Sequence, residues 1–239
     1  MIEQSCLHQA QRRRLLHLLA LLGGAGAGSP AFALSLADLT NTDASQGIKA
    51  ALTQGVQVAV SQLGQNGGFF NNPQLRIPLP GYMGEAAKMM RRFGQGRYVD
   101  EVEQGINRAA ELAVPMGKDV LLDAVQRMTL DDAKRILSGG EGSVTTFFME
   151  KTRQPLTQRF LPVVTQATGQ VGVVQQYNQL AGKAASFGVS SDALDLNQYV
   201  TGKTLDGLYA VIGEQERAIR QNPLGSANAA VRKVFGALR

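Results

Sequence analysis

Residues 99–113, VDEVEQGINRAAELA, decide the fold class of this 239-residue chain. Apolar side chains recur there at steps of three and four residues, the spacing that places them on one face of an α-helix. These side chains are Val99, Val102, Ile106, Ala110 and Ala113. The same spacing returns through most of the chain, and no stretch shows the two-residue alternation of a half-buried strand. The sequence therefore predicts an all-α protein.

Helix boundaries are predicted from capping residues, glycines and prolines. Separate helices are expected over about 81–93, 130–137, 143–152 and 171–187, and Pro155 is expected to open a further helix that ends near residue 168. We find no internal repeat and no linker long enough to divide residues 34–239. The prediction is one irregular bundle of about eight or nine helices.

One segment interrupts the helical pattern. Residues 69–80, FFNNPQLRIPLP, contain three prolines, each of which lacks an N–H and restricts the residue before it. We expect an extended segment that lies across the bundle. Arg76 within it is expected to anchor the segment to a carboxylate on a neighbouring helix, with Glu111 or Glu214 as the partner.

The first 33 residues have the layout of a secretory signal. Arg12–Arg14 form a basic start, residues 15–22 are apolar except for His17, and Ala31-Phe32-Ala33 supplies a cleavage site. The apolar run is shorter than the about 20 residues that span a bilayer, so no membrane anchor is expected. The prediction is cleavage after Ala33 and a periplasmic location for 34–239. The Sec and twin-arginine routes of export both remain open.

Cleavage after Ala33 would remove the chemistry of imidazole and thiol. Cys6, His8 and His17 are the only residues of their types in the chain. The remaining 206 residues would then lack Ser-His-Asp and Cys-His catalysis, zinc sites built on nitrogen or sulfur, haem ligation through these groups, and disulfides. We expect no metal and no cofactor.

The charge balance gives no sign of a nucleic-acid partner. The first 33 residues hold three of the 24 basic and one of the 19 acidic side chains, so the rest carries a formal charge of only +3. Export would also separate the protein from DNA and RNA.

Asp100, Glu103, Asn107 and Glu111 form one polar stripe on the helix that the opening stretch predicts. Paired carboxylates, with Arg108 beside Glu111, are one candidate for acid–base chemistry on a glycan. We favour the alternative, a solvated face with weak ion pairs of about 0.2–0.5 kcal/mol each. A third possibility is that Asn107 or Arg108 bridges to an adjacent loop.

Other conspicuous residues have ordinary structural interpretations that we favour over functional ones. Asp131 and Asp132 suit a helix N-terminus better than a cation site, and Glu216–Arg220 has the spacing of a surface ion pair. The bulky aromatic residues are expected in the core, with an apolar-ligand pocket as the alternative. They are Phe69, Phe70, Phe147, Phe148 and Tyr177.

Several short motifs, in order along residues 34–239, resemble a family of exported bacterial proteins classed as a domain of unknown function. They are Leu36-Ala37-Asp38-Leu39, Asn72-Pro73, Arg76-Ile77-Pro78-Leu79-Pro80, Asn107-Arg108-Ala109-Ala110-Glu111, Met128-Thr129, Asp132-Ala133-Lys134, Gly139-Gly140, Leu205-Asp206-Gly207-Leu208 and Ile219-Arg220-Gln221-Asn222-Pro223. The resemblance implies a periplasmic, helical, single-domain protein, and it supplies no activity, substrate or catalytic residue.

The sequence thus favours an exported binding or scaffold protein of the cell envelope that performs no covalent chemistry. Its partner would be an envelope protein or a small ligand. Two alternatives stay open. One is a hydrolase that uses Asp100, Glu103 and Glu111 on envelope glycan, and the other is a carrier of an apolar ligand. The oligomeric state is not predicted.

Overall fold

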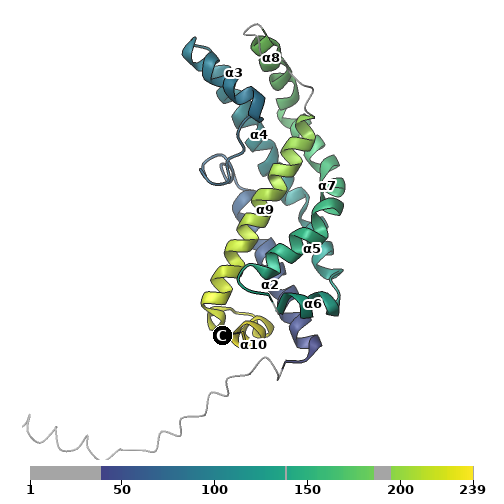
Figure 1. Cartoon of the computed structure of the whole chain (residues 1–239). Helices are drawn as coiled ribbons and strands as arrows, with labels where there is room; N and C mark the ends of the chain where they lie inside the picture. The colour runs from purple at the N-terminus through teal and green to yellow at the C-terminus, as the bar shows by residue number, and fades with distance from the viewer. Residues whose placement is uncertain (1–38, 138, 186–194, 239) are drawn as a thin grey trace, which may run out of the picture. The chain divides into compact units, whose positions relative to one another are not determined.

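The computed structural model describes residues 39–137, 139–185 and 195–238 (Figure 1). The predicted signal segment and its cleavage site lie outside these residues, as does most of the polar connection expected near 190–196. Within the described part of the chain there are nine α-helices, one 3-10 turn and no strand. The all-α prediction is confirmed.

The elements follow one another in this order: α2 (Asn41–Leu63), α3 (Gly81–Arg92), α4 (Gly96–Met116), α5 (Lys118–Gln126), α6 (Leu130–Leu137), α7 (Ser143–Val171), α8 (Val173–Ala185), α9 (Leu196–Gln221), η2 (Pro223–Gly225) and α10 (Ala229–Gly236). None of these helices is both long enough and apolar enough to cross a membrane.

Helix α9 organises the bundle by packing against both α2 and α7 (Figure 1). Helix α4 packs against α7 and α8. The main contacts of α3 are with α4 and α8. Every α-helix contributes to one hydrophobic core, in which Leu52, Ile106, Phe160 and Leu208 are all at most 1% exposed. This shared core makes the described residues a single domain.

Reciprocal capping boxes close the starts of two helices. Thr40 and Asp43 form a reciprocal capping box at the start of α2. At α6 the amide of Thr129 donates to Asp132 Oδ2 at 2.8 Å, and the amide of Asp132 donates to Thr129 Oγ1 at 3.3 Å. Each pair satisfies backbone donors that the first turn of a helix leaves free.

The expected break between residues 152 and 155 is wrong, because α7 runs unbroken from Ser143 to Val171 with Pro155 and Pro162 inside it. Each proline removes the hydrogen bond to the carbonyl four residues earlier. Both prolines lie on the exposed face, as do Lys151 and Gln158, whose carbonyls lose their helical partners. Water can solvate those carbonyls, so the helix continues.

Residues 69–80 are only partly extended. Residues 69–75 form a series of turns, in which the Asn72 carbonyl accepts from the amides of Leu75 at 3.1 Å and Arg76 at 2.8 Å. The chain is extended from 76 to 80, where Ile77 and Leu79 are buried. Of the five aromatic residues expected in the core, Phe70 alone is half-buried and the other four are buried.

Candidate functional site

The polar stripe on α4 divides into an exposed half and a buried half. Asp100 is exposed and Glu103 half-buried, and both carboxylates bind the guanidinium of Arg91 on α3. One and two turns further along α4, Asn107 is 0% exposed and Glu111 is 1% exposed. The structure therefore does not bring Asp100, Glu103 and Glu111 together at one open face.

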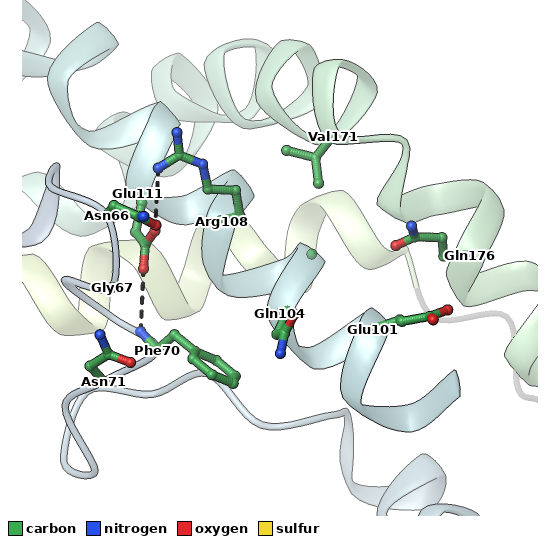
Figure 2. Close-up of a pocket in the computed structure, with 11 residues that line it drawn as sticks. Asn66, Gly67, Phe70, Asn71, Glu101, Gln104, Arg108, Glu111, Val171 and Gln176 are labelled. Atoms are coloured by element: carbon green, nitrogen blue, oxygen red, sulfur yellow. Dashed lines mark hydrogen bonds and ion pairs between the residues drawn. The ribbon is translucent and has the colours of Figure 1, made fainter. Parts of the chain in front are cut away.

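Glu111 holds the start of the non-helical segment. Its Oε1 accepts hydrogen bonds from the amides of Phe69 at 3.2 Å and Phe70 at 3.3 Å, and its Oε2 lies 3.5 Å from Arg108 Nη1 (Figure 2). A buried carboxylate is costly unless hydrogen bonds or an opposite charge compensate it. Here it has both, so its two oxygens are occupied by structural partners.

Asn107 holds the extended part of the same segment. Its Oδ1 accepts from the amide of Ile77 at 2.9 Å, and its Nδ2 donates to the Ile77 carbonyl at 2.8 Å. Nδ2 also donates to the Glu103 carbonyl within α4, at 2.8 Å. The side-chain amide of Asn107 thus pairs with the N–H and the C=O of Ile77, as the backbone of a neighbouring β-strand would. The bridge from Asn107 to a loop, considered from the sequence, is present.

Helix α9 supplies further contacts to the segment. The hydroxyl of Tyr199 donates to the Pro78 carbonyl at 2.8 Å, and burial raises the pKa of this phenol. Phe69 packs against Gly207, where an added Cβ would lie 2.5 Å from Phe69 Cε1. The segment is thus held between α4 and α9.

The expected anchor through Arg76 is wrong. Arg76 Nε donates to the Phe70 carbonyl at 2.8 Å, and its guanidinium lies over the Phe70 ring, 3.9 Å from the centroid. Within the described part of the chain no ion pair joins Arg76 to Glu111 or Glu214, and Glu214 is exposed on α9. The backbone amides of the segment already occupy Glu111, so Arg76 folds back onto its own turn.

A groove of about 540 Å³ opens beside Glu111 (Figure 2). Residues from three places line it: the turn after α2, the outer face of α4, and the junction of α7 with α8. They are Asn66, Gly67, Phe70, Asn71, Glu101, Gln104, Gly105, Arg108, Glu111, Val171 and Gln176. Gly67 has φ +81°, a conformation that favours glycine, and this turns the chain along the rim of the groove.

Four carboxamide side chains face this groove, those of Asn66, Asn71, Gln104 and Gln176. Each can donate and accept hydrogen bonds. The Oε1 atom of Gln176 is buried and is the one buried side-chain N or O atom in the described residues that has no hydrogen-bond partner. These amides carried no recognisable signal in the sequence, because they come from separate elements and belong to no short motif.

The groove has little capacity for metal binding or carboxylate catalysis. Within the described residues, no group of three or more His, Cys, Asp or Glu side chains is placed to hold a metal ion. Glu101 and Glu111 are its two carboxylates, and ten residues of α-helix separate them by about 15 Å along the axis. Glu101 is further engaged by Arg97 Nε at 3.0 Å.

Glu216 is buried, which corrects the prediction of a surface ion pair. It is 3% exposed and accepts from the amides of Val144 at 3.2 Å and Thr145 at 2.8 Å, at the start of α7. Arg220 Nε donates to Glu216 Oε1 at 2.9 Å, and Arg220 Nη2 donates to Ser143 Oγ at 2.9 Å. Glu216 on α9 therefore caps a different helix, a role that i, i+4 spacing does not reveal.

Removal of the Glu111 carboxylate tests its structural role. Glu111→Ala is expected to lower the free energy of unfolding by about 2–6 kcal/mol, because one buried and one partly buried backbone amide lose their acceptor at roughly 1–3 kcal/mol each. Glu111→Gln keeps one acceptor oxygen and should cost less. Urea unfolding followed by circular dichroism measures both.

The matched control is Glu85→Ala, which removes a solvent-exposed carboxylate from the ion pair with Lys88 on α3. Its urea midpoint should stay close to that of the wild type. A Glu111→Ala midpoint that is also unchanged would contradict the structural role.

Comparison with known proteins identifies a family without assigning an activity. No curated protein and no solved structure matches the chain. Residues 38–236 match the family described as "Protein of unknown function (DUF4197)". This match covers most of the sequence and almost every residue of the helical bundle, and we conclude that the chain belongs to the DUF4197 family.

Proposed function

We propose that the protein is an exported binding protein of the cell envelope, and that the groove beside Glu111 binds a polar, glycan-containing ligand without cleaving it. One observation carries the proposal. The groove is lined by four carboxamides, one guanidinium, one aromatic ring and two carboxylates, and both carboxylates are held by structural partners, Glu101 by Arg97 and Glu111 by backbone amides and Arg108.

The lining suits a ligand rich in hydroxyl and amide groups. Such groups donate and accept hydrogen bonds, and the carboxamides of Asn66, Asn71, Gln104 and Gln176 match both functions. The buried Oε1 of Gln176 lacks a partner, and rotation of this carboxamide toward the groove would let a ligand hydroxyl or amide donate to it. A volume of about 540 Å³ accommodates a ligand of one or two sugar rings with a short peptide.

Arg108 adds a preference for a carboxylate. Its side chain is 44% exposed, and the contact with Glu111 engages only Nη1. A guanidinium has five N–H donors, so several stay available for a carboxylate of the ligand. Fragments of peptidoglycan combine sugar hydroxyls, amides and carboxylates, and they are therefore the ligand class that we propose.

The geometry favours binding over hydrolysis. Glycoside hydrolysis by two carboxyl groups requires a separation of about 5–9.5 Å. Glu101 and Glu111 stand about 15 Å apart along α4, and Glu111 already accepts from two backbone amides. Asp100 and Glu103, the other candidates from the sequence, bind Arg91 and do not line the groove.

The proposed location rests on the sequence of residues 1–33. If this segment is a cleaved signal, the full-length gene product should be recovered from the osmotic-shock fraction of a Gram-negative host with an N-terminus at Leu34. N-terminal sequencing of that material measures the outcome. A protein that begins at Met1 and stays with the cytosol would contradict export.

Ligand binding is tested with the exported protein and soluble muropeptides in isothermal titration calorimetry. The wild type should bind saturably. Arg108→Gln should weaken binding about 5- to 30-fold, because a charge-assisted hydrogen bond contributes roughly 1–2 kcal/mol more than a neutral contact. Gln158→Ala, an amide removed from the outer face of α7 away from the groove, is the control and should bind as the wild type does.

Mass spectrometry of the muropeptides after incubation separates the proposal from its alternative. Recovery of intact ligand agrees with binding alone, whereas cleaved glycan would favour a hydrolase. Equal affinities of the Arg108→Gln and wild-type proteins would show that the groove at Arg108 does not bind the muropeptide. Capture of an envelope protein that competes with the muropeptide for the groove at Arg108 would also contradict the proposal.

A further inference from the structure

Helices α5, α6 and α7 lie next to one another (Figure 1), and a second groove, of about 520 Å³, is lined by their side chains. It is separate from the groove beside Glu111 and shares no lining residue with it. We propose that this second groove binds an anionic amphiphile, a molecule with one negatively charged head group and an acyl chain. The inference goes beyond the proposed function, because ligand binding in this groove does not depend on ligand binding in the groove beside Glu111.

The inner surface of this groove is apolar. Leu156 of α7 is 1% exposed and Met128, in the link between α5 and α6, is 9% exposed. Half-buried Ala124 and the ring of Pro155 extend the same surface toward solvent. An acyl chain that lies on this surface gains up to about 0.8 kcal/mol for each methylene removed from water. The volume is within the roughly 300–1,000 Å³ of ligand sites in proteins.

The rim carries three cationic side chains, Arg127, Lys151 and Arg159. Asp123 is the carboxylate that Arg127 and Arg159 share: Arg127 Nε donates to it at 3.0 and 3.1 Å, and Arg159 Nη1 at 2.6 Å. Hydrogen bonds from Arg159, and then from Arg127, hold the pKa of Asp123 below its usual value. One carboxylate thus fixes two guanidinium groups and leaves both Arg127 Nη groups for another anion.

Lys151 supplies the third positive charge. Its ammonium lies 5.6 Å from the centroid of the Phe147 ring, and it forms no ion pair with the described residues. Asp132 is the acidic residue that lines the groove, and its carboxylate is occupied by the amide of Thr129 at the start of α6. The rim therefore has more cationic donors than carboxylates available to receive them.

These two features require different parts of one ligand. The cationic rim selects an anionic head group, and the apolar surface selects a chain. A carboxylate and a phosphate ester both fit the rim, so a fatty-acid anion and a lysophospholipid share the recognised chemistry. A purely polar anion would leave the apolar surface exposed to water, and a neutral apolar ligand would leave the cationic side chains without an anionic partner.

Isothermal titration of the exported protein with dodecanoate, below its micellar concentration, tests the inference. Saturable binding is expected, and decanoate should bind about 3- to 15-fold more weakly because it has two fewer methylenes. Dodecyltrimethylammonium has the same chain and the opposite charge, and it should bind at least tenfold more weakly than dodecanoate. Lysophosphatidylglycerol that competes with dodecanoate would assign the site to a lipid head group, and failure to compete would assign it to a free carboxylate.

Lys151→Gln should weaken the binding of dodecanoate about 3- to 10-fold and reduce its dependence on salt. The control Arg217→Gln removes one positive charge from the exposed face of α9 and should leave the affinity unchanged. Arg108→Gln should also leave it unchanged, which separates this groove from the first. Absence of dodecanoate binding, equal binding of the cationic detergent, or equal losses in Lys151→Gln and Arg217→Gln would each overturn the inference.

Discussion

The structure depends on how a helical bundle accommodates one stretch of backbone that is not helical. A helix satisfies its own amides and carbonyls, whereas an irregular segment inside a protein must find partners elsewhere. Residues 69–80 bury Phe69, Ile77 and Leu79, so their backbone enters the core with them. Glu111 and Asn107 on α4 supply the missing partners, and α9 encloses the segment from the other side.

The protein uses the same solution a second time. Glu216 on α9 accepts the free amides at the start of α7, and Arg220 balances its charge. Both carboxylates are almost fully buried, and both act on the backbone of another element. Glu111 and Glu216 therefore maintain the fold. A binding role that depends on amides, guanidinium groups and apolar surface follows more naturally from this arrangement than carboxylate catalysis does.

The sequence predicted the features that depend on local patterns. Helical periodicity predicted the all-α class, and the helix expected over 130–137 is α6. It failed where the outcome depends on what faces a residue in space. The prolines of α7 point outward, so they do not break the helix, and spacing along the chain does not reveal that orientation. Glu216 was expected at the surface because its spacing from Arg220 does not reveal that it faces the start of α7. The amides of the first groove, such as Asn66 and Gln176, come from distant parts of the chain and form no motif.

The attachment of residues 69–80 to α4 also shapes the first groove, because Phe70 and Asn71 line it only while the segment stays in place. Native-state hydrogen exchange measured by NMR tests this attachment most directly. The amides of Phe69, Phe70 and Ile77 lie outside regular secondary structure, yet they should exchange as slowly as the core amides of α4. The amide of Gln74 donates only to the side chain of Asn72, at 3.0 Å on the exposed side of the same segment, and should exchange much faster. If Phe69, Phe70 and Ile77 exchange as fast as Gln74, then Glu111 and Asn107 do not hold the segment, and the account is wrong at its centre.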